Sequence, residues 1–223
     1  MNFEPTTLDF LHGRRFSNGA RFALGNRGRA TRRTDRLLDM ARGQRVLHVG
    51  CCDHLPHLRD RVARGVHLHQ LLCAAAARCV GSDTNLQGLS LLRELGFAEV
   101  YAPEKVPDLE FDLCLLADVI EHVGDPVSFL RSMSRYRFRQ LVITTPNVFR
   151  WRNCLPGAEL VNTDHRLWFS PYTLCKILVD SGYEPVAVEL CHGDHVSLLG
   201  AVAARVLDFV PRWRDTLLVT AQP

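Results

Sequence analysis

Short β-rich runs alternate with helical patterns along most of the chain, and this alternation limits the possible folds more than any other feature. Apolar residues in the stretches between the runs recur at a spacing of about 3.6, as on one face of a helix. Strands separated by helices form βαβ units, whose strands lie parallel in one sheet. The sequence therefore predicts an α/β fold. The expected strands are Arg45–Val49, Cys79–Ser82, Glu99–Ala102, Phe111–Ala117, Gln140–Thr144, Pro185–Leu190 and Thr216–Thr220, and the expected helices are Thr31–Ala41, His69–Ala77, Leu86–Leu95, Pro126–Arg137, Pro171–Ser181 and Ser197–Phe209.

Several helix ends carry local signals. Asp125-Pro126 and Ser170-Pro171 each combine a capping residue with a proline suited to the first helical turn. Gly96 and Gly182 suit the carboxyl ends of helices. The long irregular piece Pro146–Phe169 is typical of a functional loop, because structureless segments of this length are uncommon in compact domains.

The length of 223 residues and the hydrophobic content of 47% suit a single domain with a sizeable core. We expect residues 1–44 to be an arginine-rich helical segment that packs on a domain formed by residues 45–223. Arginine supplies almost all the basic charge, since Lys105 and Lys176 are the only lysines. The arginines near the N-terminus have two interpretations: a solvated helix face, or a surface for an anionic partner.

Neither a membrane span nor a secretion signal is expected. No apolar run approaches the ~20 residues that a span requires, and the first residues lack a basic region followed by an apolar core. These features favour a cytoplasmic protein, whose oligomeric state the sequence does not indicate. The eight cysteines form no CxxC pair, so we expect small buried apolar residues rather than disulfides or a zinc ribbon.

The turn after the first expected strand is a candidate ligand loop. In open parallel sheets ligands bind at the carboxyl ends of strands, where Gly50 offers a small residue and positive φ. Asp83 ends the second strand and suits the two hydroxyls of a ribose. The alternatives are a plain loop at Gly50 and a helix N-cap at Asp83. The long interval between the two residues predicts that Leu55–Val66 is an insertion in a loop.

Three later segments resemble class I S-adenosylmethionine-dependent methyltransferases. Phe111–Pro126 matches the pattern FDxxxxxxVxEHxxDP, and Thr144–Asn147 and Asp164–Glu184 continue the resemblance. It implies a Rossmann-like sheet of seven strands in the order 3-2-1-4-5-7-6, with the last strand antiparallel and helices on both faces. It also implies S-adenosylmethionine as the cofactor.

The resemblance also implies positions for that cofactor. Gly50, Cys51 and Cys52 would lie along its methionine part and Asp83 on its ribose, although Cys52 and His54 replace glycines and His48 replaces an acid of the family pattern. The remaining residues expected at the cofactor are Thr84, Pro103 and Asp118, with Pro103 standing where an aspartate often meets the adenine.

Asp118, Glu121 and His122 are expected on one helix face, because they lie three and four residues apart. Together with His165 they form a candidate site for one divalent cation, Mg²⁺ or Mn²⁺, with histidine favouring Mn²⁺. The set is similar to the ExxEH motif and downstream histidine of ubiquinone-biosynthesis O-methyltransferases and small-RNA 2′-O-methyltransferases. The alternative is a capping box from Asp118 to Glu121. Without a metal, His122 or His165, assisted by Glu121, is the candidate general base.

Other candidate ligand groups follow these motifs. Trp151, Trp168 and Phe149 suit stacking on a sugar or an aromatic acceptor, or packing beneath the long loop. Cys191–His195 is rich in ligand atoms but is also typical of a polar loop.

The resemblance favours an O-methyltransferase for a hydroxylated small molecule or glycan of a biosynthetic pathway. Two alternatives stay open: RNA ribose 2′-O-methylation, which fits the arginines and the metal set, and a degenerate cofactor-binding protein without activity.

Overall fold

The structure is a computed structural model that describes residues 3–22, 29–154, 156, 161–194 and 204–223. Seven strands form one sheet in the order β3-β2-β1-β4-β5-β7-β6. The first five strands run parallel to one another, whereas β7 is antiparallel to both β5 and β6. The strands are β1 (Arg45–Val49), β2 (Arg78–Ser82), β3 (Val100–Tyr101), β4 (Glu110–Ala117), β5 (Arg137–Pro146), β6 (Glu184–Cys191) and β7 (Thr216–Gln222). The α/β fold, the strand order and the reversed last strand are all confirmed.

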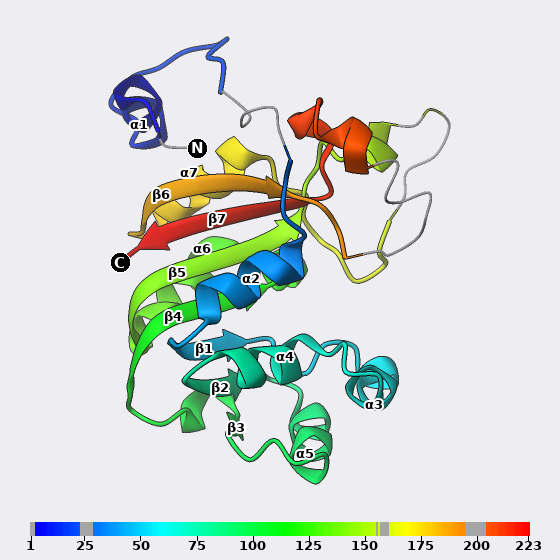
Figure 1. The fold of residues 1–223 in the computed structure, drawn as a ribbon. Helices are drawn as coiled ribbons and strands as arrows, with labels where there is room; N and C mark the ends of the chain where they lie inside the picture. The colour runs from blue at the N-terminus through cyan, green and yellow to red at the C-terminus, as the bar shows by residue number, and fades with distance from the viewer. Residues whose placement is uncertain (1–2, 23–28, 155, 157–160, 195–203) are drawn as a thin grey trace.

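Helices lie on both faces of this sheet. α2 and α4 cover one face, and α6 and α7 cover the opposite face (Figure 1). The central strands are buried on both sides, which explains why β1 and β4 are nearly continuous apolar runs. The helices are α1 (Pro5–Leu11), α2 (Arg33–Ala41), α3 (Leu55–Ala63), α4 (Leu68–Ala75), α5 (Leu86–Glu94), α6 (Pro126–Ser132) and α7 (Pro171–Asp180), with 3-10 turns η1 (Pro103–Lys105), η2 (Ile120–His122), η3 (Met133–Arg135), η4 (Trp151–Cys154) and η5 (Pro211–Trp213).

The local helix signals act as predicted. The side chain of Asp125 accepts a hydrogen bond from Ser128 N–H at the start of α6. Ser170 forms a capping box with Thr173 at the start of α7. Gly96 and Gly182 follow α5 and α7 with positive φ angles.

Two expectations about helices need correction. Leu55–Val66 was predicted to be a loop, but most of it is the helix α3, because Leu58 is buried and packs with residues of α5 in one apolar cluster. The predicted helix Pro126–Arg137 is divided into α6 and the 3-10 turn η3. Within the predicted helix Ser197–Phe209, residues 197–203 lie outside the described residues and residues 204–207 are helical.

The N-terminal segment reaches both faces of the sheet. α1 lies beside α7, where Lys176 Nζ donates a hydrogen bond to the Leu11 carbonyl at 2.8 Å and Leu11 itself is buried. α2 packs beside α4, and its Leu37 is buried in the apolar cluster on that face. Among the described residues, no helix has the length and apolar character needed to cross a membrane.

The described part of the Pro146–Phe169 segment is tied to the sheet by Asn147, which is fully buried. Its Nδ2 donates to the carbonyls of Arg212 and Arg214, both at 2.8 Å. Val148 N–H donates to the Phe169 carbonyl at 3.0 Å, so the two ends of the segment lie side by side. This segment therefore starts and ends at the same edge of the sheet.

Candidate active site

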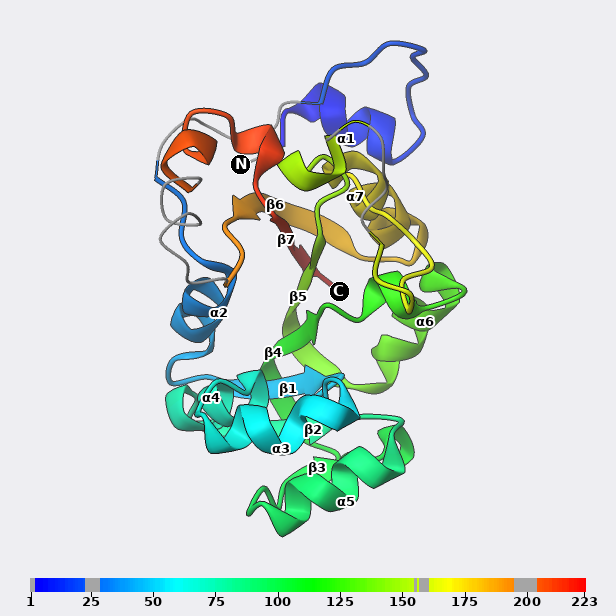
Figure 2. The ribbon, with the colours of Figure 1, turned by 90° about the vertical axis from the view of Figure 1, so that its right-hand side faces the viewer.

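The candidate residues meet on the side of the molecule where the parallel strands end. Figure 2 shows this side, with α3 in front of the sheet. The turns that follow β1, β2, β3 and β4 bring Gly50, Asp83, Pro103 and Asp118 to this edge. Ligands of open parallel sheets bind at such an edge.

Gly50 is required by its surroundings. Its φ is +81°, and a Cβ atom at this position would lie 2.4 Å from Cγ2 of Val119, in the turn after β4. The turns after β1 and β4 are thus in direct contact. The N–H groups of Gly50 and Cys51 donate to the Ser82 carbonyl at 2.8 and 3.3 Å, which ties the turn to the end of β2.

We expect Gly50→Ala to lower the free energy of unfolding by about 3 kcal/mol, measured by urea denaturation. Left-handed backbone costs a residue with a Cβ about 1–2 kcal/mol, and the overlap with Val119 adds a similar amount. Gly96→Ala is the control, because Gly96 also has positive φ but open space around it, so only about 1 kcal/mol is expected. Equal losses in the two variants would contradict the close contact with Val119.

Cys51 and Cys52 are fully buried in the apolar cluster that contains Leu58 and Leu89. A Cβ added to Gly88 of α5 would lie 2.8 Å from both Cβ and Sγ of Cys52. The Cys52 side chain therefore fills the contact between the turn and α5. A cysteine can stand here in place of the glycine of the family pattern because its side chain packs inward.

Asp83 orders the turn. One carboxylate oxygen accepts the Cys52 N–H and the other accepts the Asn85 N–H, both at 2.9 Å. A carboxylate has about four acceptor positions, so lone pairs remain for a ligand. The alternative role as a helix cap is wrong for Asp83, because Asn85 caps α5 by accepting from Gly88 N–H at 2.9 Å.

Thr84 and Pro103 lie on either side of this turn region. Thr84 is exposed next to Asp83. Pro103 starts η1 after β3, and its carbonyl accepts a hydrogen bond from the Tyr136 hydroxyl at 3.0 Å.

Asp118 is held by the N-terminal segment. Its carboxylate forms an ion pair with Arg33 of α2 and accepts a hydrogen bond from the Thr144 hydroxyl at 3.1 Å. Arg33 Nε also donates to Asp194 at 3.0 Å, and the Arg33 side chain is only 17% exposed. The interpretation of Arg33 as part of a solvated face is therefore wrong, because two carboxylates enclose it. Arg36 is also paired, through two hydrogen bonds to Glu189.

The expected capping box from Asp118 to Glu121 does not form. Asp118 has a positive φ of +54° and the chain then enters the 3-10 turn η2, whose N-cap residue is Val119, without a side-chain cap. This backbone directs the Asp118 carboxylate to Arg33 and the Glu121 carboxylate to Thr145. The two carboxylates therefore serve different partners.

Three of the four predicted metal ligands come together. One ligand atom each of Glu121, His122 and His165 lies within 4.8 Å of the others, and we call these residues the Glu-His-His cluster. Asp118 is outside this group, which corrects the prediction that Asp118 shares one helix face with Glu121 and His122 and that all three bind a cation together with His165. The left-handed backbone and the ion pair with Arg33 explain the difference.

Glu121 is buried at the centre of the Glu-His-His cluster, with 1% of its surface exposed. Its Oε2 accepts the Thr145 hydroxyl at 2.9 Å. Its Oε1 has no hydrogen-bond partner among the described residues and lies 3.9 Å from His165 Nε2. Burial, followed by the charge of Asp118, raises the pKa of Glu121 to about 8. The carboxyl group is therefore mostly protonated at neutral pH.

Residues near the end of the long Pro146–Phe169 segment position the two histidines. His122 Nδ1 lies 3.1 Å from the Asp164 carbonyl, and the N–H groups of Arg166 and Leu167 donate to the Glu121 carbonyl. The rings of His122 and His165 are nearly perpendicular, with centroids 4.7 Å apart. Burial and the neighbouring His122 lower the pKa of His165, which favours its neutral form.

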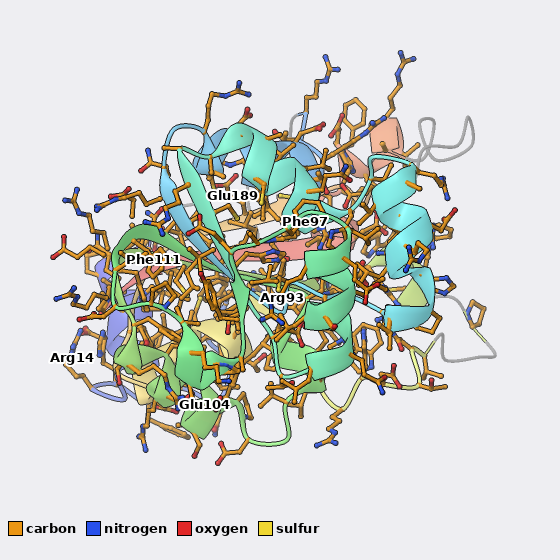
Figure 3. The ribbon with its side chains drawn as sticks, turned by 90° about the horizontal axis from the view of Figure 1, so that it is seen from below. Arg14, Arg93, Phe97, Glu104, Phe111 and Glu189 are labelled. Atoms are coloured by element: carbon orange, nitrogen blue, oxygen red, sulfur yellow. The ribbon has the colours of Figure 1, made fainter. Side chains whose placement is uncertain are left out.

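We expect the wild type to lose stability relative to Glu121→Gln as the pH rises from about 4.5 to about 8 in the presence of EDTA. The folded state binds the Glu121 proton more tightly than the unfolded chain does, so the free energy of unfolding falls with pH across that window. Urea denaturation at several pH values measures the difference. Glu104→Gln, at an exposed glutamate labelled in Figure 3, is the control and should show no pH-dependent difference in stability from the wild type. The same pH-dependent difference in both variants would contradict the raised pKa of Glu121.

The Glu-His-His cluster fits a metal ion in one chemical respect. Glu121 Oε1 and His165 Nδ1 are buried polar atoms that find no hydrogen-bond partner in the described part of the chain. Two imidazoles and one carboxylate suit Mn²⁺ better than Mg²⁺, which prefers oxygen ligands. A cation here would offset the cost of an ionised Glu121.

Several important residues were not singled out by sequence reasoning. Thr145 and Arg166 contact Glu121 through its side chain and its backbone, and neither stands out by type or spacing.

The Cys191–His195 stretch anchors the N-terminal segment: His192 exchanges backbone hydrogen bonds with Thr31 and Arg33, and Asp194 binds Thr34. His195 lies outside the described residues.

Aromatic side chains lie beside the Glu-His-His cluster. The rings of Trp168 and His165 are 5.9 Å apart, and the guanidinium of Arg150 lies 4.8 Å above the Trp168 ring. Phe149 carries the guanidinium of Arg212 at 4.4 Å. Trp168 and Arg150 therefore border the Glu-His-His cluster.

No protein-family model and no curated protein matches the chain. Solved structures do match. An S-adenosylmethionine-dependent methyltransferase of Archaeoglobus fulgidus is 20% identical, with a TM-score of 0.53 over 86% of this chain and 91% of its own. A second, from Mesorhizobium loti, is 17% identical, with a TM-score of 0.50 over 84% of this chain and 96% of its own.

A third match was solved with bound S-adenosylhomocysteine. It is the magnesium protoporphyrin IX methyltransferase of Synechocystis PCC 6803, 13% identical, with a TM-score of 0.52 over 85% of this chain and 81% of its own. At these identities the likeness concerns the fold. The strand order, the reversed β7 and these matches together show that the chain has the fold of the class I S-adenosylmethionine-dependent methyltransferases.

Proposed function

We propose that the chain is an S-adenosylmethionine-dependent O-methyltransferase that acts on a hydroxylated small molecule or glycan in a biosynthetic pathway. The observation that carries this proposal is the Glu-His-His cluster at the strand-end edge of a methyltransferase fold. The cluster joins a proton acceptor and candidate metal ligands at the edge where such folds bind their ligands.

The turn residues support cofactor binding. When bound, S-adenosylmethionine supplies an electrophilic methyl group. Asp83 keeps free lone pairs for the ribose while its other hydrogen bonds order the turn. The residues that we assign to the cofactor are Gly50, Cys51, Cys52, Asp83, Thr84, Pro103 and Asp118, with the two cysteines contributing backbone because their side chains are buried.

The histidines supply the proton chemistry of the proposal. A neutral His165 accepts the proton of the acceptor hydroxyl. The His122 ring packs nearly perpendicular to the His165 ring and supports its orientation. Methyl transfer needs alignment of donor and acceptor more than a nucleophile on the enzyme. Alternatively, Glu121, His122 and His165 would hold a divalent cation, which would lower the pKa of a coordinated hydroxyl in place of proton transfer to His165.

The surroundings favour a ring-shaped acceptor. Trp168 and Phe149 are flat apolar rings that carry the guanidinium groups of Arg150 and Arg212 over one face, so we propose the opposite face for an acceptor. Such faces stack on sugars and aromatic rings. The RNA alternative gains less support, because Arg33 and Arg36 of the N-terminal segment are already bound to carboxylates within the chain.

Transfer of a labelled methyl group tests the proposal. The purified protein would be incubated with methyl-labelled S-adenosylmethionine and separate panels of phenols, glycans and short RNAs, with Mn²⁺ or with EDTA. Label on a hydroxyl of the first two panels is expected. Label that persists in EDTA would assign the proton transfer to His165, and label that EDTA removes would assign it to a bound cation. Label on RNA alone would replace the proposed acceptor class, and binding of S-adenosylhomocysteine without transfer to any acceptor would favour the inactive alternative.

A further inference from the structure

A second group of metal-ligating side chains lies between α4 and the sheet, apart from the Glu-His-His cluster. His69 and Cys73 lie four residues apart on α4, so they share one face of that helix. Cys79 lies on β2 and belongs to the apolar cluster that α4 covers. His69 and Cys79 are buried, whereas Cys73 is exposed.

The distances suit a single ion. Cys73 Sγ lies 3.7 Å from His69 Nε2, and Cys79 Sγ lies 3.7 Å from His69 Nδ1. One ligand atom of each residue lies within 4.8 Å of the other two. Tetrahedral zinc, with bonds of about 2.3 Å to sulfur and about 2.0 Å to nitrogen, separates such ligands by about 3.5–3.8 Å. The two sulfurs lie beside different nitrogens of the His69 ring, and Nδ1 faces His48, so we assign Nε2 to the ion. A rotation of the Cys79 side chain toward Nε2 would complete the geometry.

The surroundings of His69 fix its ring. His48 of β1 stacks on it with ring centroids 5.4 Å apart, and the two Nδ1 atoms are 3.3 Å apart. Phe97, labelled in Figure 3, contacts the ring at a centroid distance of 5.8 Å. Burial and the neighbouring His69 hold the pKa of His48 well below its usual range, so His48 brings no positive charge. A ligating histidine usually has such a partner for its other nitrogen.

The two cysteines supply the sulfur ligands that a soft metal prefers. The thiolate is the form that binds metals. The exposure of Cys73 gives an ion access from solvent.

We propose that His69, Cys73 and Cys79 bind one Zn²⁺ ion, with a solvent molecule as the fourth ligand. Two thiolates and one imidazole select Zn²⁺ over Mg²⁺ or Mn²⁺, which prefer oxygen ligands. Binding releases the thiol protons to solvent. The ion ties α4 to β2 behind the turn that contains Gly50. This site is independent of the proposed methyltransferase activity.

Cobalt titration tests the site, because Co²⁺ takes tetrahedral zinc sites and absorbs light. The metal-free protein, kept reduced with a phosphine, would be titrated with Co²⁺ and then with Zn²⁺. We expect a thiolate-to-cobalt charge-transfer band that saturates at one equivalent and is removed by Zn²⁺. Zn²⁺ is also expected to raise the melting temperature and to protect Cys73 from alkylation.

Variants separate this site from the others. Cys73→Ser should remove most of the band without unfolding the chain, because Cys73 is exposed, and Cys79→Ser should do the same. Cys154→Ser, at another exposed cysteine, and His122→Ala, in the Glu-His-His cluster, should leave it unchanged. Absence of the band in the wild type, or an undiminished band in folded Cys73→Ser, would overturn the proposal.

Discussion

Replacing Asp83 with alanine is expected to weaken the binding of S-adenosylhomocysteine by about 10- to 100-fold. Hydrogen bonds to a charged group contribute about 1.5–3 kcal/mol, and Asp83 holds the Cys52 N–H as well as the proposed ribose. Its loss therefore removes ligand contacts and loosens the turn together. Isothermal titration calorimetry measures the affinity.

The control is Asp60→Ala, at an exposed carboxylate on α3 that pairs with Arg64. This variant should bind S-adenosylhomocysteine as tightly as the wild type does, because surface pairs contribute little. Unchanged affinity in folded Asp83→Ala would contradict the assignment of this carboxylate to the ribose.

His165→Ala is expected to lower kcat by about 10²–10⁴-fold, the usual contribution of a positioned general base. The affinity for S-adenosylhomocysteine should stay unchanged, because His165 belongs to the Glu-His-His cluster and not to the turn at Gly50. Initial rates with the best acceptor of the labelled-methyl assay, measured beside calorimetry, separate the two effects.

His57→Ala, at an exposed histidine of α3, is the matched control and should retain full activity. A fall in kcat that matches a fall in cofactor affinity would show that His165 acts through folding of the site. Full activity in His165→Ala would remove it from the chemistry.

The sheet could be predicted from the sequence because apolar periodicity and turn chemistry agree along its length. All seven strands lie where the runs of β-rich residues predict them, and Asp125 and Ser170 cap their helices as expected. The pattern failed at Leu55–Ala63, where an interval between two motifs was interpreted as a looped insertion although Leu58 packs like a core residue.

The candidate site could be predicted only in part, because side chains turn according to backbone and partners that are distant in sequence. The offset of three and four residues placed Asp118 with Glu121 and His122, but the positive φ at Asp118 and an ion pair with Arg33 separate it from them. Cys79 likewise gave no sign that it would meet His69, because they come together only when α4 packs on β2.

Binding of S-adenosylhomocysteine to the wild type is the most direct test of the central claim that the turn at Gly50 and Asp83 holds a methyl donor. The account predicts saturable heat at a stoichiometry of one and a rise in melting temperature, both reduced in Asp83→Ala. No heat and no thermal shift at millimolar ligand, from protein shown to be folded, would contradict it.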